Sequence, residues 1–396
     1  MKIGILTFHD AHNYGAMLQC YALQQFLLKK GYNVEVIDYR PAFYQKQYHR
    51  HSLCPWIGKN PVRTMKSIYY NYYLFNKRCA AFSDFHNRHL YMSIPATRTN
   101  IPQSYDAYIV GSDQIWNPQL TNGFHDVYFC DFCFPKGKSR FIAYAPSMEI
   151  SKLSTQEAEY LTRVLNCFDA LSVRESSLIP ILQPLVSQPI RQVLDPTLLL
   201  DATAWNPLIG KCPENRPYVV LYQVRENPAV RMKAFEIAQS IGGIVVELTA
   251  RIDCHYSTKY QTASPADFVT YIRYATYVVT TSFHGTAFSL IFNRPFYTFS
   301  LGDDFDSRSV SLLESVNLTE RLVCPGEQFE ISLIDFRQAN KRLEHLRKQS
   351  RDFLRQSLHE GQDQSTSIFQ KTFFSHESFY YSSLLLSCIK TNPMCA

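Results

Sequence analysis

The sequence lacks the long apolar segments of membrane proteins and the leader of secreted ones. A transmembrane helix needs about eighteen or more apolar residues in a row, and no such run occurs here. The first ten residues carry only a short apolar run after Lys2, which does not fit a signal peptide. We therefore expect a cytoplasmic protein.

Glycine and proline are scarce, and the cysteines form no clear framework. With 14 Gly and 20 Pro among 396 residues, collagen-like and low-complexity chains are excluded, and 46% hydrophobic residues suffice for a buried core. The eleven cysteines are odd in number and include one CxxC pair, Cys130 and Cys133. No second pair follows at zinc-finger spacing, so we interpret them as reduced thiols, with metal or redox function of the pair as the alternative.

Several motifs of nucleotide-binding and metal-binding proteins are absent. The sequence has no GxGxxG, no Walker A motif and no nucleophile elbow, which argues against NAD and P-loop chemistry. The histidines form pairs without a full ligand set, and the acidic run at residues 302–306 does not fit an EF-hand. We expect no metal and no resident cofactor. The acidic run is expected to be a solvated loop, and the alternative is that it holds a cation.

The positive charge is concentrated in one stretch. The net charge is +6, yet residues 41–100 alone hold nine Lys or Arg against one acid, Asp84. Aromatic residues accompany these cations, among them Trp56, Tyr69, Tyr70, Tyr72 and Tyr73. Such a surface suits nucleic acid, a phosphate-bearing glycan or an anionic membrane. The alternative is a solvated, partly helical insertion.

Strand and helix patterns alternate along the amino-terminal half. Strands are expected at residues 2–8, 33–38, 107–110, 141–144, 170–173 and 192–194, and helices at 16–30 and from the capping box Ser154–Glu157 to about 168. Strands that alternate with helices predict a parallel sheet with right-handed crossovers.

A second series follows a connector at residues 206–216. Strands are expected at 218–222, 244–248, 277–281 and 296–299, and helices at 229–240, 265–275, 286–292 and 333–358. The fold class is thus α/β, with two Rossmann-like domains facing across a cleft. The predicted boundaries are 1–205, with an insertion at about 41–100, then 206–332, and a carboxyl-terminal helix and tail at 333–396. Because ligands of open α/β sheets bind at the carboxyl ends of strands, polar residues at these ends are the candidates for a site.

Three such loops belong to the first half. Asn13, Tyr14 and Gly15 lie between the first strand and first helix, where amides and the helix dipole suit an anion; the alternative is that Asn13 only caps the helix. The second loop follows the strand at 107–110. Its Asp113 can accept a proton or orient a sugar hydroxyl, and the alternative is that Asp113 makes an Asx turn. After the strand at 170–173, Arg174 either clamps a carboxylate or phosphate, or pairs with an acid as a structural bridge.

His284 follows the strand at 277–281 and precedes Gly285 and Thr286 at the expected start of a helix. An imidazole, a hydroxyl and free amides can meet one anion at such a place. We therefore expect His284 and Arg174, one from each half, to line a common hollow.

Several ordered motifs together resemble one known family. They are Asn13-Tyr14-Gly15, Gly111-Ser112-Asp113-Gln114-Ile115-Trp116, Ser172-Val173-Arg174-Glu175, Leu194-Asp195-Pro196-Thr197 and Thr281-Ser282-Phe283-His284-Gly285-Thr286. The sequence is similar over roughly residues 1–325 to the polysaccharide pyruvyl transferase family. The resemblance implies a GT-B-like fold and transfer of pyruvate from phosphoenolpyruvate, as co-substrate, to a surface-polysaccharide sugar as a cyclic ketal.

The resemblance also assigns residues to two sides of a site. His284 and Asp113 are expected to be catalytic. The donor-binding set is Arg174, Ser282, His284, Gly285, Thr286, Asn13 and Gly15, and the acceptor-binding set is Asp113, Gln114, Ser112 and Tyr14. Family members with an Arg-Leu-His triplet have a cation where this chain has Ser282. Either donor binding is weaker in this chain, or a cation from elsewhere, for example Arg225, Arg251 or Arg294, replaces the missing one.

The basic aromatic stretch then suits a lipid-pyrophosphate-linked oligosaccharide acceptor and peripheral contact with an anionic membrane at the inner face, rather than nucleic acid. Two alternatives stay open: a GT-B glycosyltransferase that uses a nucleotide sugar, and a non-catalytic glycan- or anion-binding relative. No feature of the sequence predicts the oligomeric state.

Overall fold

The structure is a computed structural model. It describes residues 1–41, 62, 65, 68–132, 137–249, 252, 257–303, 306–327 and 329–359. The chain divides into a unit Met1–Arg351, which contains both sheets, and a unit Asp352–Ala396, of which only the end of one helix is described. The predicted domain boundaries after residues 205 and 332 stay predictions.

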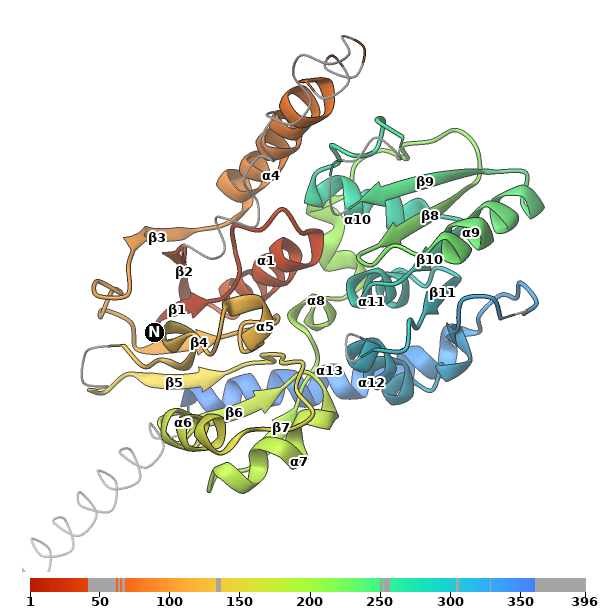
Figure 1. Ribbon diagram of the computed structural model, residues 1–396. Helices are drawn as coiled ribbons and strands as arrows, with labels where there is room; N and C mark the ends of the chain where they lie inside the picture. The colour runs from red at the N-terminus through yellow and green to blue at the C-terminus, as the bar shows by residue number, and fades with distance from the viewer. Residues whose placement is uncertain are drawn as a thin grey trace, which may run out of the picture. The chain divides into compact units, whose positions relative to one another are not determined.

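A parallel sheet of seven strands forms the amino-terminal half (Figure 1). The strands are β1 (Lys2–Leu6), β2 (Asn33–Tyr39), β3 (Met92–Ala96), β4 (Ala107–Val110), β5 (Arg140–Ala143), β6 (Ala170–Val173) and β7 (Ile190–Gln192). Their order, β3-β2-β1-β4-β5-β6-β7, is the Rossmann order extended by one strand. The prediction missed β3 and placed β7 two residues too late.

The described helices of this half are α1 (Tyr14–Lys29), α4 (Phe75–His89), α5 (Pro118–Thr121), α6 (Thr155–Leu165), α7 (Ile179–Leu182) and α8 (Pro196–Leu199). Four of these six, α1, α5, α6 and α8, begin after a side chain that caps them. The Asn13 side chain accepts hydrogen bonds from the amides of Gly15 and Ala16, and so starts α1. The capping box of Ser154 and Glu157 starts α6, as predicted.

A smaller parallel sheet forms the carboxyl-terminal half. Its strands are β8 (Tyr218–Gln223), β9 (Ile244–Thr249), β10 (Tyr277–Thr280), β11 (Phe296–Phe299) and β12 (Leu322–Val323). Their order is β12-β11-β10-β8-β9, which is the doubly wound order 2-1-3-4-5 when the strands are numbered within this half. The predicted fold class of two Rossmann-like α/β halves is confirmed.

The helices of the second half are α9 (Pro228–Ser240), α10 (Pro265–Tyr274), α11 (Phe283–Ile291), α12 (Ser307–Val316) and α13 (Phe336–His359). The predicted start of α11 at residue 286 was wrong, because Ser282 takes the N-cap position and the helix begins at Phe283. The sequence patterns did not predict α12.

The helix α13 follows the second half in sequence but binds the turn after β7 in the first. The Ser350 hydroxyl accepts a hydrogen bond from the amide of Leu194 at 2.9 Å. Arg347 donates to the carbonyl of Leu198 at 2.7 Å, and Arg351 donates to that of Leu199 at 2.6 Å. The turn between β7 and α8 is therefore held from both halves.

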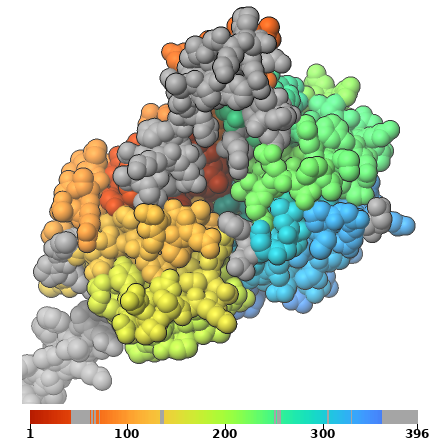
Figure 2. Space-filling model, in the orientation of Figure 1, coloured from red at the N-terminus to blue at the C-terminus, as the bar shows by residue number. Residues whose placement is uncertain are grey.

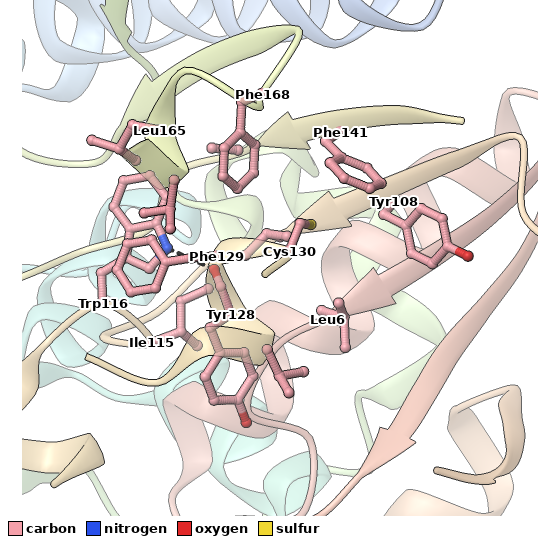
Figure 3. Close-up of a cluster of buried hydrophobic side chains, with 14 of the residues drawn as sticks. Leu6, Tyr108, Ile115, Trp116, Tyr128, Phe129, Cys130, Phe141, Leu165 and Phe168 are labelled. Carbon is pink, nitrogen blue, oxygen red and sulfur yellow. Dashed lines mark hydrogen bonds between the residues drawn. The ribbon is translucent and has the colours of Figure 1, made fainter. Parts of the chain in front are cut away.

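The core of the first half is rich in aromatic side chains (Figure 3). Trp116 stacks on Phe129 at 5.1 Å between ring centroids and donates its indole N–H to the carbonyl of Tyr128 at 2.8 Å. Cys130 is buried in the same cluster, and Cys133 lies outside the described residues. Because Trp116 is fully buried, the loop after β4 is anchored directly beside Asp113.

The basic aromatic stretch is only partly described. Its described end holds the π-helical segment Tyr69–Leu74, α4 and β3, whereas Lys46, Arg50, Trp56, Lys59, Arg63 and Lys66 lie outside the described residues. The interpretation as a solvated insertion needs correction for α4, because Arg78 and Phe82 are each only 2% exposed. Arg78 donates to the carbonyls of His12 and Gln261 and to the Tyr14 hydroxyl. This part of the stretch thus belongs to the packed body.

Candidate active site

Each sheet reverses its winding direction at one place, and both places contribute to one pocket. In the first sheet β1 and β4 are neighbours whose chains continue toward opposite edges, and in the second sheet β8 and β10 are such a pair. Ligands of α/β proteins bind at the carboxyl ends of strands at these switch points. The loops after all four strands line the pocket described next.

The pocket has a volume of about 180 Å³. It is lined by Phe8, Asn13, Ala16, Asp113, Gln114, Leu120, Val224, Arg225, Thr281, Ser282, Phe283, His284 and Arg308. The structure therefore brings five of the expected site residues together: Asn13, Asp113, Gln114, Ser282 and His284. The mixture of one carboxylate, one imidazole, two guanidinium groups and several neutral polar groups suits a small polar ligand with negative charge.

His284 lies in the first turn of α11 and is almost fully buried. Its Nε2 atom lies 3.8 Å from the nearer Asp195 carboxylate oxygen and has no hydrogen-bond partner among the described residues. Burial lowers the pKa of His284, although Asp195 and Asp113 oppose this effect. The imidazole is therefore mainly neutral near pH 7, and an anion bound beside it would favour its protonated form.

Gly15 lies against this imidazole. A Cβ atom added at residue 15 would lie 2.0 Å from Nδ1 of His284, so only glycine leaves room for the ring. We expected Gly15 to allow close approach of an anion, and the structure corrects this: the group that approaches is His284. The Gly15 amide also donates to Asn13 Oδ1 at 2.9 Å, which is the capping role left open for Asn13.

Asp195 is the central acid of the site, and it is fully buried. Its carboxylate accepts hydrogen bonds from Arg174 Nη1 at 2.9 Å and from the Thr197 amide and hydroxyl at 2.9 and 2.7 Å. Burial alone would raise the pKa of Asp195, but His284, Arg174 and the Thr197 hydrogen bonds hold its pKa below the usual value. Because His284 is mainly neutral, the positive charge that balances the Asp195 carboxylate near pH 7 comes from Arg174.

Arg174 does not line the pocket of His284, contrary to our expectation of a common hollow. It lines a neighbouring pocket of about 170 Å³ that shares Phe283 and Arg308 with the first. Its guanidinium stacks over Phe283 at 4.9 Å and lies 3.8 Å from the carboxylate of Asp113. The alternative role of Arg174, a structural bridge to an acid, is therefore present, because Arg174 pairs with Asp195 and Glu175. Burial alone would lower the pKa of Arg174, but these acids outweigh that effect.

Asp113 and Gln114 reach the pocket from the loop after β4. Asp113 adopts a φ of 73°, and its side chain is 12% exposed. Gln114 donates to the carboxylate of Glu149. Ser112, expected beside them, is fully buried; its hydroxyl lies 2.7 Å from the carbonyl of Ala145 and 3.2 Å from Asp195. The structure therefore keeps Ser112 outside the pocket lining.

Three other expected residues also lie outside the lining. The Tyr14 ring is fully buried between Phe82 and Phe268, with centroids 5.4 and 4.8 Å away. The Thr286 hydroxyl is within bonding distance of the Ser282 carbonyl and of Thr298, and a Cβ at Gly285 would collide with Thr280. The Tyr14 ring therefore packs between the two halves, whereas the Thr286 hydroxyl is bonded within the second half.

Two arginines supply positive charge that Ser282 does not. Arg225, one of the three expected replacements, lines the pocket and pairs with Asp303 and Asp306; Asp304 lies outside the described residues. Arg308 was not predicted; it lines the pocket from α12 and pairs with Glu149 at 2.9 Å. Of the other replacements, Arg294 is not in the lining, and Arg251 lies outside the described residues.

The residues that the sequence reasoning missed differ in the signal they gave. Asp195 belongs to one of the motifs quoted from the sequence but was given no place in the site, although a capping acid ahead of Pro196 at the end of a strand was visible. Arg308 gave no signal, because it lies on a helix after the second sheet's fourth strand and not at a strand end. Glu149, which binds both Arg308 and Gln114, follows β5 in an irregular segment.

The chain was compared with known proteins. No curated protein matches the chain. The UDP-N-acetylglucosamine 2-epimerase from Rickettsia bellii is similar in structure, with a TM-score of 0.40, 10% identity and 88% of each chain covered. The heptosyltransferase WaaC of E. coli with ADP has a TM-score of 0.37 and 11% identity, over 87% of this chain and 100% of that chain.

The sequence model of one family matches most of the described chain. The match runs over residues 13–303 and includes the loops that bring Asn13, Asp113, Asp195 and His284 together. Since it covers well over half of the chain, the protein belongs to the polysaccharide pyruvyl transferase family.

Proposed function

We propose that the protein transfers pyruvate from phosphoenolpyruvate to a sugar of a surface polysaccharide or its precursor, forms a cyclic ketal and releases phosphate. The observation that carries this proposal is the pocket at both switch points, where His284, Asp113 and Arg308 line one small space. Family membership supplies the reaction class, and the charge of the pocket agrees with an anionic donor.

The reaction needs one proton donor and one proton acceptor. A proton adds to C3 of phosphoenolpyruvate, one sugar hydroxyl oxygen bonds to C2, and the bond from C2 to the phosphate oxygen breaks with its electron pair leaving on phosphate. The second hydroxyl oxygen then bonds to C2. Of the two hydroxyl protons, one replaces the proton taken up by C3 and the other goes to phosphate.

Two residues of the pocket suit these roles. His284 has an unpartnered Nε2 among the described residues, and a bound anion would raise its pKa, so it serves as the acid for C3. Asp113 has a partly exposed carboxylate in the same pocket and accepts or orients a hydroxyl proton. Arg174 acts through them, because it holds Asp195 next to His284 and lies beside Asp113. It is a positioning residue in this scheme.

The test is incubation of the purified protein with phosphoenolpyruvate and candidate lipid-linked oligosaccharides. We expect phosphate release and an acceptor whose mass grows by one pyruvate less one water. His284→Gln and Asp113→Asn should each lower turnover by about 100-fold or more. Near-normal turnover of either variant would remove that residue from the reaction.

Thermal stabilisation by ligands, combined with the incubation assay, separates the two alternatives. Thermal stabilisation by phosphoenolpyruvate and not by nucleotide sugars supports pyruvyl transfer. Stabilisation by a nucleotide sugar, with sugar added to the acceptor, would identify a glycosyltransferase instead. Binding of phosphoenolpyruvate without phosphate release from any acceptor would identify a non-catalytic relative.

We further propose that the segment just before α4, with Met65, Ile68, Tyr69 and Tyr73, brings the protein to an anionic membrane and its lipid-linked acceptor. None of the described helices is long and apolar enough to cross a bilayer. Met65, Ile68, Tyr69 and Tyr73 are 42% to 72% exposed, and residues of this part of the chain, in orange, lie at the upper edge of the face in Figure 2. Cations from the surrounding sequence complement anionic headgroups.

Vesicle sedimentation tests this membrane contact. The protein should sediment with vesicles that contain anionic lipid and not with neutral ones. Met65→Ser together with Tyr69→Ser and Tyr73→Ser should abolish sedimentation, whereas Met232→Ser with Phe235→Ser, which changes exposed apolar residues of α9, should not. Equal sedimentation of both variants would contradict the proposal, and so would self-association through this segment without lipid binding.

A further inference from the structure

Two glutamines of α1 are fully buried, although an amide side chain is costly to bury without hydrogen bonds. Gln24 donates to the Tyr91 carbonyl at 2.8 Å and accepts from the Tyr91 amide at 3.0 Å. It therefore fastens the helix to the residue before β3. Gln19, just over one turn earlier in α1, makes its hydrogen bonds to segments of the candidate active site instead.

The Gln19 amide connects the loop after β1 to the loop after β4. Its Nε2 atom donates to the Thr7 hydroxyl at 2.9 Å and to the carbonyls of Phe8 and Ala16 at 3.3 and 3.0 Å. Its Oε1 atom accepts from the Ser112 amide at 3.2 Å. The Thr7 hydroxyl in turn donates to the Ser112 carbonyl at 2.9 Å. The peptide groups on both sides of Ser112 are thus held by two side chains that also bond to each other.

Ser112 immediately precedes Asp113, whose side chain lines the pocket of His284. The Ser112 carbonyl belongs to the peptide group that leads into Asp113. Because a peptide group is planar, the hydrogen bond from Thr7 fixes the plane from which the Asp113 side chain branches. Gln19 itself is not in the pocket lining, so it touches the ligand space only through the residues that it holds.

We propose that Gln19 is a positioning residue, which together with Thr7 holds the Asp113 carboxylate in the orientation that the acceptor hydroxyl needs. The assignment rests on the proposed function, in which Asp113 accepts or orients a hydroxyl proton of the acceptor. A displacement of about 1 Å at a reacting group can lower the rate by about 100-fold. Loss of the Gln19 amide is therefore expected to lower turnover and to spare binding of the donor.

The main test compares Gln19→Met with the matched control Gln24→Met. Both changes keep a long side chain in α1, and both remove hydrogen bonds to the backbone of another segment. Both should lower the melting temperature, because they leave buried backbone groups without partners. Only Gln19→Met should lower turnover, by about 10- to 100-fold. Its affinity for phosphoenolpyruvate, measured by calorimetry without acceptor, should stay that of the wild type. Equal loss of turnover in both variants would overturn the assignment.

A double-variant cycle tests whether Gln19 acts through Asp113. In an Asp113→Asn background, Gln19→Met should cause little further loss of phosphate release, because the group that it positions is already disabled. Independent losses that multiply in the double variant would contradict this role.

Thr7 gives a second route, which also serves if Gln19→Met does not fold. Thr7→Val removes the donor to the Ser112 carbonyl, and turnover should fall by about 10-fold. Thr7→Ser keeps the hydroxyl and should keep the turnover of the wild type. The same turnover in the Val and Ser variants would overturn the assignment.

The outcomes separate this assignment from the proposed function. If the wild-type protein releases no phosphate from phosphoenolpyruvate with any acceptor, the proposed function fails, and the assignment fails with it. If the wild-type protein turns over and folded Gln19→Met turns over equally fast, only the assignment of Gln19 is overturned.

Discussion

The backbone of Gly15 and the imidazole of His284 are in direct contact, although they come from the first helices after β1 and β10. A Cβ atom at residue 15 would lie 2.0 Å from Nδ1 and 2.4 Å from Cγ of His284. Neither a backbone nor an imidazole ring can be compressed by that amount. The position of His284, the proposed proton donor in the second half, thus depends on Gly15 in the first half.

Gly15→Ala should displace the ring of His284 and disable the enzyme. We expect phosphate release to fall by about 100-fold or more, because a shift of about 1 Å at a reacting group is sufficient for that loss. Gly210→Ala is the matched control, since its nearest neighbour, Thr270, would lie 3.8 Å from the new Cβ. Equal activity of the two variants would show that His284 tolerates displacement.

Asp195→Asn should remove the nearest of the three carboxylates around Arg174 without changing the shape of the site. Breaking a buried ion pair on one side typically costs about 3–5 kcal/mol, and we expect a loss of this order in the free energy of unfolding, measured in urea. Turnover should fall with it, because His284 loses its neighbouring carboxylate. Asp201→Asn, at an exposed helix cap, is the control; a similar small effect of both changes would contradict the central role of Asp195.

Arg78→Ala should weaken the contact between α4, the loop after β1 and the second half. Arg78 donates to the carbonyls of His12 and Gln261 at 3.0 and 2.8 Å, and it is 2% exposed. Loss of such buried charge-assisted hydrogen bonds should lower the free energy of unfolding by about 2–4 kcal/mol. Arg88→Ala on the exposed side of the same helix should change it by less than about 0.5 kcal/mol. Urea titration of the two variants decides.

Stability should fall as the pH falls from 6.5 toward 4. Burial is the main cause that lowers the pKa of His9 from 6.5 to about 4, and His86 and Arg40 act in the same direction against Asp38. Between these two values the unfolded chain binds a proton at His9 and the folded chain does not, so acid favours unfolding. The contribution of His9 is at most about 3 kcal/mol.

Melting temperatures between pH 7 and 4.5 check this prediction. His9→Gln keeps a donor for the Tyr39 carbonyl, 3.2 Å from Nε2, and should flatten the pH dependence. His345→Gln, which changes an exposed residue of α13, should leave the dependence unchanged. An unchanged slope in His9→Gln would assign the acid sensitivity to other groups.

The fold could be predicted because its signals are local. Capping residues such as Asn13, Ser154 and Ser264 and the apolar runs of the strands fix where elements begin, and the alternation of strands and helices fixes the parallel sheets. Ligands of α/β proteins bind at the carboxyl ends of parallel strands, which meet at one edge of the sheet. This principle identified Asp113 and His284 from the sequence.

The direction of side chains could not be predicted in the same way. Whether Tyr14 turns into the pocket or into the core depends on Phe82 and Phe268, which lie far away in sequence. The entry of Arg308 into the site depends on how α12 packs, and no spacing in the sequence encodes that. The sequence predicted, as one alternative, a pairing of Arg174 with an acid, which is present, but it did not predict that Arg174 lines the neighbouring pocket and not that of His284.

The hydrogen bonds between α13 and the segment after β7 have a consequence for folding during synthesis of the chain. Arg347, Ser350 and Arg351 bind backbone atoms of residues 194–199, which precede them by about 150 positions. The ribosome synthesises all seven strands of the amino-terminal sheet well before it reaches these residues of α13. The bonds from α13 to residues 194–199 can therefore form only after almost the whole described polypeptide has been synthesised, and until then the turn has the contacts of Asp195 with Ser112, Arg174 and Thr197.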